Sequence, residues 1–150
     1  MAGETGIERP NGGRRPCGNL NLEIAVEQIY GNMNIQGREN WSLFDFGSHN
    51  TYVVQDVADL LPTSGLVKPI RATLDGSAKE VTHVALLNGE LEGLPISMHA
   101  MVIDRLGDDE TGRPIEILFG ALAMQQWGVR LIPEHEKIDL SHYPLEFVEF

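Results

Sequence analysis

The stretch LFDFGSHNTYVV, residues 43–54, places a carboxylate, Asp45, between an apolar run and a tight turn. Gly47 lets the backbone turn sharply, because glycine has no Cβ to restrict its conformation. A carboxylate held at such a turn can take up or release a proton, which is the chemistry of general acid–base catalysis. A lone Asp in a turn is also an ordinary loop-capping residue. The chemistry therefore depends on what the rest of the chain brings to Asp45.

The composition is that of an acidic globular chain. The 150 residues include 11 Lys and Arg against 22 Asp and Glu, a formal net charge of −11, and 42% are hydrophobic. This charge argues against non-specific binding to nucleic acid or to an anionic membrane, because both need a positive surface. We therefore expect neither nucleic acid nor membrane as a partner.

The chain divides into a tail and one domain. Residues 1–18 contain five Gly, two Pro and three Arg with few apolar side chains, which predicts a flexible tail. Residues 19–150 are enough for a single domain with its own core. No apolar run has the length of a signal-peptide core or a membrane-spanning helix, so we expect a cytoplasmic protein.

Apolar residues with a period of two predict strands through most of the chain. Asp75-Gly76 between two such runs is a strong hairpin signal. The predicted strands lie in LNLEIAV (20–26), QIYGNMNIQG (28–37, with turns at Gly31 and Gly37), WSLFDFG (41–47), TYVV (51–54), the hairpin over 67–87, LEGLPISMHAMVID (91–104), IEILFG (115–120), a hairpin over 129–140 around Pro133-Glu134, and LEFVEF (145–150).

Helical signals are few. ALAMQQWG, residues 121–128, predicts a short helix that ends at Gly128, and residues 54–61 have the spacing of a helical turn closed by Pro62. LGDDETGRP, residues 106–114, reads as a polar loop. Many short strands with one helix in the C-terminal third and no alternation of strand and helix predict an all-β barrel or sandwich.

Three of these elements, in this order, resemble the retropepsin-like aspartic proteases. They are the Asp-x-Gly-Ser turn at Asp45, the hairpin ATLDGSAKE (72–80), and IEILFGALAMQQWGVRLI (115–132), and the resemblance extends over residues 20–140. It implies a closed β-barrel with one short helix. It also implies that the domain acts as a homodimer. Each subunit would contribute one Asp45 to a shared site for a peptide or protein substrate.

The resemblance also implies a mechanism. Two neighbouring carboxylates cannot easily both ionise, so they share a proton and titrate as a pair. One Asp45 would act as general base toward a water, and the other would protonate the leaving amine. Ser48 would bond to the outer carboxylate oxygen, and Gly120 would lie beneath the loop, where a side chain would clash. The flap, which would close over substrate, is formed by Asp75, Gly76 and Ser77.

Phe46 departs from the family pattern, which has Thr or Ser after the Asp. That hydroxyl braces the two active-site loops across the dimer axis, whereas Phe has no donor or acceptor. Two hypotheses follow: an aspartic endopeptidase in which Phe46 is tolerated, or an inactive dimerisation or peptide-binding module of the same fold.

The other reactive residues do not indicate a nucleophilic or metal-binding site. Cys17 has no nearby His to activate it, and the acidic run 107–110 lacks the ligand spacing of a calcium loop. The histidines lack the spacing typical of metal ligands, so we predict no metal and no cofactor; they are His49, His83, His99, His135 and His142.

Overall fold

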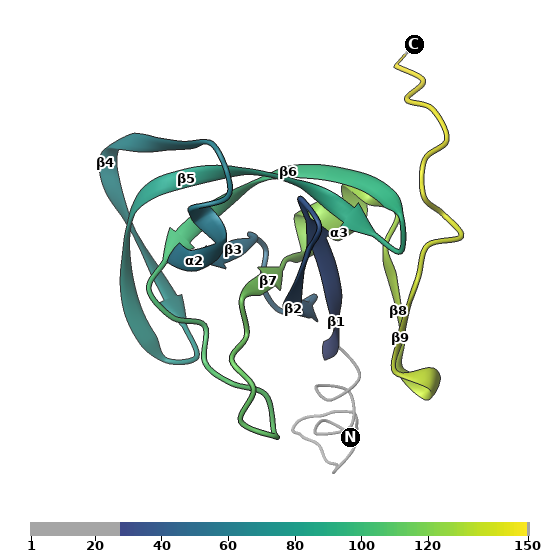
Figure 1. The fold of residues 1–150 in the computed structure, drawn as a ribbon, viewed down its shortest axis with the longest axis horizontal. Helices are drawn as coiled ribbons and strands as arrows, with labels where there is room; N and C mark the ends of the chain where they lie inside the picture. The colour runs from purple at the N-terminus through teal and green to yellow at the C-terminus, as the bar shows by residue number, and fades with distance from the viewer. Residues whose placement is uncertain (1–27, 150) are drawn as a thin grey trace, which may run out of the picture.

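The structure, a computed structural model, describes residues 28–149, and it consists mainly of strands (Figure 1). The predicted tail, residues 1–18, and the predicted strand at 20–26 lie outside the described residues. In chain order the elements are β1 (Gln28–Ile35), β2 (Arg38–Asp45), β3 (Tyr52–Val54), α2 (Gln55–Ala58), β4 (Thr63–Leu74), β5 (Ser77–Leu91), β6 (Leu94–Ile103), β7 (Ile117–Phe119), α3 (Ala121–Trp127), β8 (Arg130–Ile132), the 3₁₀ turn η1 (Pro133–His135) and β9 (Lys137–Asp139).

Three hairpins build most of the sheet, and each turns through a residue pair that ends in glycine. The pairs are Gln36-Gly37, Asp75-Gly76 and Glu92-Gly93, and all six residues have positive φ. Such turns match the right-handed twist of the strands they join. The prediction of a hairpin at Asp75-Gly76 is confirmed. The predicted turn at Gly31 is wrong, because this glycine lies within β1 opposite Ser42.

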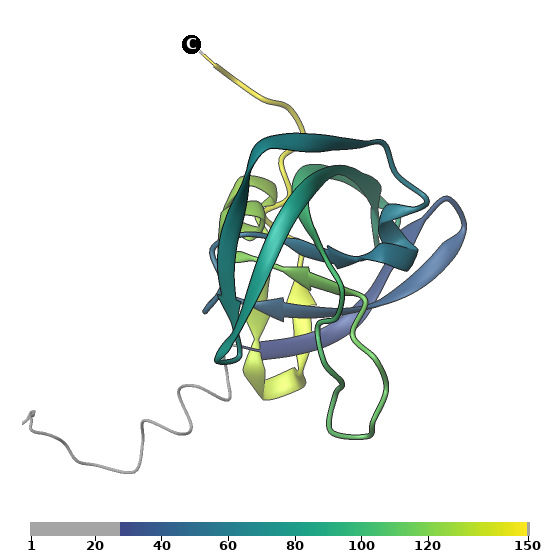
Figure 2. The ribbon, with the colours of Figure 1, turned by 90° about the vertical axis from the view of Figure 1, so that its left-hand side faces the viewer.

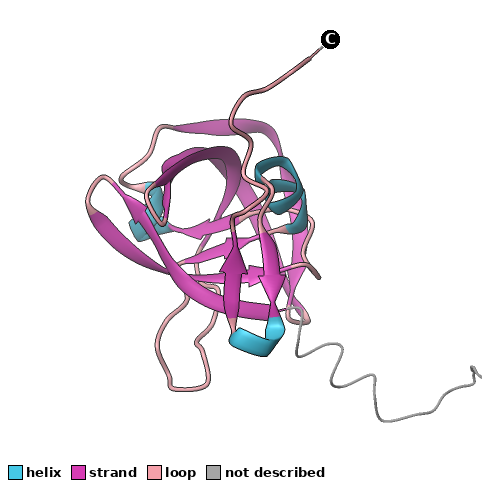
Figure 3. Cartoon of the chain, turned by 90° about the vertical axis from the view of Figure 1, so that its right-hand side faces the viewer, coloured by secondary structure: helices cyan, strands magenta, loops and turns pink. Residues whose placement is uncertain are grey.

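The sheet order is β1-β2-β7-β3-β6-β5-β4, with a further pairing of β1 and β5 at Asn34↔Glu90. This pairing links strands from opposite parts of the order, and the sheet is strongly curved (Figures 2 and 3). Strand β7 pairs with β2 in parallel and with β3 in the antiparallel sense. The parallel pair sets the ends of β2 and β7 side by side.

The main core fills one side of this curved sheet. Phe44 of β2 and Phe119 of β7 are fully buried, with ring centroids 5.1 Å apart. Helix α3, predicted from residues 121–128, is confirmed and packs Met124 into this core; it ends at Gly128 in the left-handed conformation. The predicted helical turn is present as α2.

The last predicted strand, LEFVEF, is wrong. Residues 145–149 form no strand, and the chain end leads away from the body of the protein (Figure 1). Leu145 is 98% exposed and Phe147 is 59% exposed. A strand needs a partner for its backbone groups as well as an alternating pattern, and the pattern alone does not supply that partner.

The predicted hairpin over 129–140 is present as β8 and β9. The helices among residues 28–149 are too short to cross a bilayer.

We expect Phe44→Ala to lower the free energy of unfolding by about 3–5 kcal/mol, because it leaves a cavity against Phe119. Val67→Ala, at a fully exposed position of β4, serves as control and should change this free energy by less than about 0.5 kcal/mol. Urea denaturation of both variants measures the difference. Similar losses in the two would contradict the assignment of Phe44 to the core.

Candidate active site

Asp45 ends β2 and begins the tight turn that the sequence predicted. The Gly47 amide donates a hydrogen bond to Asp45 Oδ1 at 2.7 Å, and the Ser48 amide donates to the Asp45 carbonyl at 3.2 Å. Gln28 Nε2, from the first residue of β1, donates to Oδ2 at 3.2 Å. The side chain is half-buried. The carboxylate is therefore oriented by the turn while it keeps access to solvent.

Ser48 does not bond to the carboxylate as predicted. Its hydroxyl donates instead to the Asn50 carbonyl at 2.9 Å. The bond that the sequence analysis assigned to Ser48 is made by Gln28, which pairs opposite Asp45 across the β1–β2 ladder. The serine thus stabilises the loop, and a neighbouring strand orients the acid. Phe46, next to Asp45, is 37% exposed.

Gly120 packs directly against this loop, as expected. A Cβ placed on Gly120 would overlap the Asn50 carbonyl and would lie 2.7 Å from the His49 oxygen. The absence of a side chain therefore allows two backbone segments to touch.

The start of α3 completes the contact between the two segments. The amide of Ala121 donates to the Ser48 carbonyl at 2.6 Å, and that of Leu122 donates to the His49 carbonyl at 3.1 Å. The first amides of a helix have no partner within the helix, so the loop carbonyls satisfy them. These backbone hydrogen bonds hold the loop that follows Asp45.

Thr51 is a supporting residue that the sequence analysis missed. It is buried, its hydroxyl accepts a hydrogen bond from the Gly120 amide at 3.1 Å, and its carbonyl accepts one from Met101 at 2.9 Å. Thr51 thus joins β6 to the Gly120 segment. A threonine in a β-rich run gave no separate signal for this role.

The predicted flap residues lie at the exposed tip of the β4–β5 hairpin. Asp75 and Gly76 form the turn itself, and Ser77 begins β5. Within residues 28–149 no hydrogen bond joins this tip to the Asp45 turn. Among these residues the tip is therefore not fastened to the loop at Asp45 by hydrogen bonds.

A second apolar cluster lies on the opposite face of the sheet from the main core. Leu43 and Leu118 belong to it, two residues before Asp45 and Gly120 respectively, and Tyr52 of β3 joins them. Residues of the β4–β5 hairpin pack against the same cluster: Leu66, Ala72, Leu74 and Val81. A buried apolar contact therefore joins the hairpin to the strand that carries Asp45.

One border of this cluster is a stack of aromatic and charged groups. Tyr30 stacks on Trp41 with centroids 5.7 Å apart, and the Arg113 guanidinium lies 4.1 Å from the Trp41 ring centroid. Asp109 accepts a bond from the Trp41 indole at 2.9 Å. Burial, followed by the carboxylates of Glu110, Asp109 and Asp45, raises the pKa of the Tyr30 phenol. The loop over 106–114 is thereby held beside the cluster.

Within the described part of the chain no group of three or more His, Cys, Asp or Glu side chains is placed to hold a metal ion. Cys17 lies outside the described residues.

The chain resembles retroviral protease-like domains of known structure. The crystal structure of the retroviral protease-like domain of Ddi1 from Leishmania major matches with a TM-score of 0.55 at 15% identity, over 77% of this chain and 90% of that one. A foamy viral protease-reverse transcriptase, solved in complex with double-stranded DNA, matches with a TM-score of 0.42 at 12% identity, over 68% of this chain and 15% of that one. No protein-family model and no curated protein sequence matches this chain. The Ddi1 likeness shows a retropepsin-like fold, as the sequence resemblance implied.

We expect Gly120→Ala to lower the free energy of unfolding by about 1–3 kcal/mol, because the new methyl group forces the 48–50 backbone away. Gly65→Ala is the matched control, since its Cβ would meet only His83 at 3.8 Å. Urea denaturation compares the two variants. An equal effect of both would show that the Gly120 contact is not tight.

The pKa of the Asp109 carboxyl is lowered from its ordinary value of 3.8, and the largest cause is the hydrogen bond from the Thr111 hydroxyl. Burial of the carboxyl acts in the opposite direction. Hydrogen bonds from backbone amides and from the Trp41 indole lower the pKa further. Folding therefore favours the ionised form. Its contribution to stability is present above the unfolded pKa and is lost as pH falls through the lower folded pKa.

We expect Thr111→Val to move the pKa of Asp109 upward toward its ordinary value, as measured by NMR titration of its side-chain carbonyl. Thr73→Val, on exposed strand β4, should leave it unchanged. A pKa that stays equally low in Thr111→Val would exclude the hydroxyl as the main cause.

Proposed function

We propose that this chain is an aspartic endopeptidase of retropepsin type, in which two copies each supply one Asp45. The observation that carries the proposal is the half-exposed Asp45 carboxylate, oriented by Gly47 and Gln28 in a loop locked to Gly120. Catalysis requires reacting groups held in fixed geometry. A loop fastened through its own backbone is suited to that task.

The chemistry needs a second carboxylate. One Asp45, ionised, takes a proton from a water as the water oxygen bonds to the scissile carbonyl carbon. The other, protonated, donates a hydrogen bond to the carbonyl oxygen and then gives its proton to the nitrogen as the C–N bond breaks. Among residues 28–149 the Asp45 carboxylate bonds to Gln28 and Gly47 and to no second acid, whereas a symmetric dimer would place an identical residue across its axis.

The surface around the loop supports this dimer. Leu122 is 56% exposed although its amide binds the loop at His49, and Phe46 projects from the loop itself. At the other end of α3, Trp127 contacts Phe147 at 5.6 Å between centroids. This contact places the exposed 145–148 segment beside the C-terminal end of α3. Unpaired strand-like segments with exposed apolar side chains commonly pair with another chain.

The apolar cluster under the hairpin supports this site. Leu43, Tyr52 and Leu118 are buried, so the cluster holds the hairpin against β2 and β7. The β4–β5 hairpin would cover an extended peptide by backbone pairing. We infer that the exposed tip at Asp75, Gly76 and Ser77 moves toward Asp45 when substrate binds.

A second candidate function is an inactive dimerisation or peptide-binding module with the same fold. Phe46 favours it, because a phenyl ring beside Asp45 cannot form the bracing bond that a hydroxyl gives. In a dimer the two rings would lie near the axis and would compete with water for the space between the carboxylates.

We expect wild-type protein to cleave an unfolded protein substrate between about pH 4 and pH 7, with faster cleavage on the acidic side because one carboxyl must hold a proton. Asp45→Asn should abolish cleavage, and Asp56→Asn, an exposed change on α2, should not. Sedimentation must show that each sample is a dimer.

Phe46→Ser separates the two functions. No cleavage by folded wild-type dimer together with cleavage by Phe46→Ser would support the inactive module. Absence of cleavage from both dimers would overturn the protease proposal. Equal cleavage by wild type and Asp45→Asn would exclude Asp45 as the catalytic acid.

A further inference from the structure

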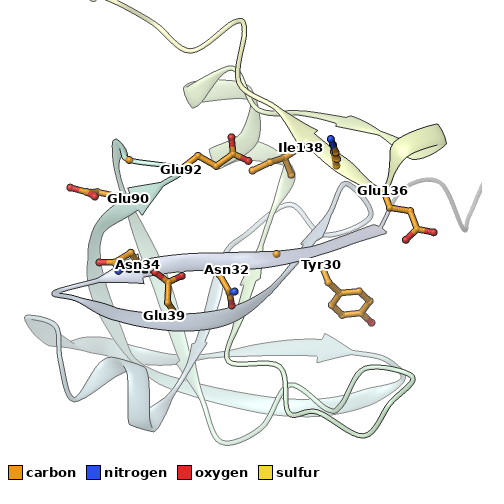
Figure 4. Close-up of a pocket in the computed structure, with 11 residues that line it drawn as sticks. Tyr30, Asn32, Asn34, Glu39, Glu90, Glu92, Glu136 and Ile138 are labelled. Carbon is orange, nitrogen blue, oxygen red and sulfur yellow. Dashed lines mark hydrogen bonds between the residues drawn. The ribbon is translucent and has the colours of Figure 1, made fainter.

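A long groove follows strand β1 on the flank of the protein, with a volume of about 680 Å³. Tyr30, Asn32 and Asn34 of β1 form its floor, the β5–β6 turn forms one wall, and the segment from Glu136 to Ile138 forms another (Figure 4). The sides come from three parts of the chain that are far apart in sequence. The groove is not the surface that the proposed peptidase reaction uses.

The groove is strongly acidic. Four glutamates line it, against the single cation Lys137; they are Glu39, Glu90, Glu92 and Glu136. All four are exposed, and within residues 28–149 none of them forms an ion pair. Glu39 accepts one bond, from Asn34 at 2.9 Å. Carboxylates of like charge along one groove repel one another and focus a negative potential there.

The arrangement fits an extended cationic chain better than a metal ion. Figure 4 shows the glutamates spread along β1, with Glu90 near one end and Glu136 near the other. They do not converge on one point, and no three of them are placed to hold a metal. An occupant must therefore carry several positive charges at intervals.

The chain itself contains such a segment N-terminal to β1. Between Glu8 and Glu23 there is no acidic residue, and Arg9, Arg14 and Arg15 give residues 9–18 a charge of +3.

Residues 9–18 belong to the same chain as the groove, so they can reach it without a second molecule. Thirteen positions separate Arg15 from Gln28, where β1 begins, and at about 3.3–3.6 Å per residue they reach up to about 45 Å. Strand β1 has eight residues, or about 27 Å. The segment can therefore turn back along the full groove, and its tether gives an effective concentration of about millimolar.

We propose that residues 9–18 bind in the acidic groove along β1, with Arg9, Arg14 and Arg15 paired to the glutamates that line it. Tyr30 at one end of the groove is two residues from Gln28, which orients Asp45. The proposal does not depend on peptidase activity.

The test uses the full chain and its one cysteine, Cys17. A nitroxide on Cys17 should cause loss of most of the amide NMR signal of Gly31, Asn32 and Gly93, but not of Gly76 at the β4–β5 tip, which does not line the groove. The loss should disappear in about 1 M salt, where charges are screened within about 3 Å.

Paired variants identify the charges. Arg14→Gln with Arg15→Gln, or Glu92→Gln with Glu136→Gln, should restore the groove signals, whereas the controls Arg71→Gln with Arg130→Gln and Glu80→Gln with Glu134→Gln should not. Groove signals unaffected by the nitroxide would overturn the proposal. So would broadening that persists in the Arg14 and Arg15 variant, or that arises only between labelled and unlabelled copies in a mixed sample.

Discussion

The candidate site depends on a direct contact between two stretches of backbone. Gly120 lies so close to the carbonyls of His49 and Asn50 that a side chain has no room, and the next two amides bind the same loop. Asp45 is therefore held by main-chain geometry, with little dependence on side-chain packing. Because α3 starts at this contact, backbone hydrogen bonds join the helix directly to the loop that carries the acid.

The parallel pairing of β2 with β7 makes this contact possible. Leu43 pairs with Leu118 and Phe44 with Phe119, so each strand sends one residue to either face of the sheet at the same level. The phenylalanines fill the main core, and the leucines belong to the apolar cluster under the hairpin. This one register therefore places the phenylalanines in the main core, the leucines in the apolar cluster and Asp45 beside Gly120.

Exposed apolar side chains and acidic side chains gather at different segments of the chain. Exposed apolar side chains occur at Phe46, on α3 at Leu122 and near the chain end at Leu145 and Phe147. Acidic side chains gather along β1 and at the 106–114 loop. The first region suits contact with an identical chain, and the second suits a cationic segment. The two proposals rest on different side chains, so either one can fail without the other.

Local signals in the sequence determined the hairpin at Asp75-Gly76, helix α3 with its end at Gly128, and the order of Asp45, hairpin and Gly120. These depend on turn geometry and on periodic burial, which act within a few residues. The tertiary structure decided the other features. It made Gln28, and not Ser48, the partner of the Asp45 carboxylate, and it gave Thr51 its supporting role. It also placed Gly31 within β1 and left residues 145–149 without a strand. It gathered Glu39, Glu90 and Glu136 in one groove. Each of these requires knowing which strand lies beside which, and a sequence pattern records how a residue is buried but not which residue it faces.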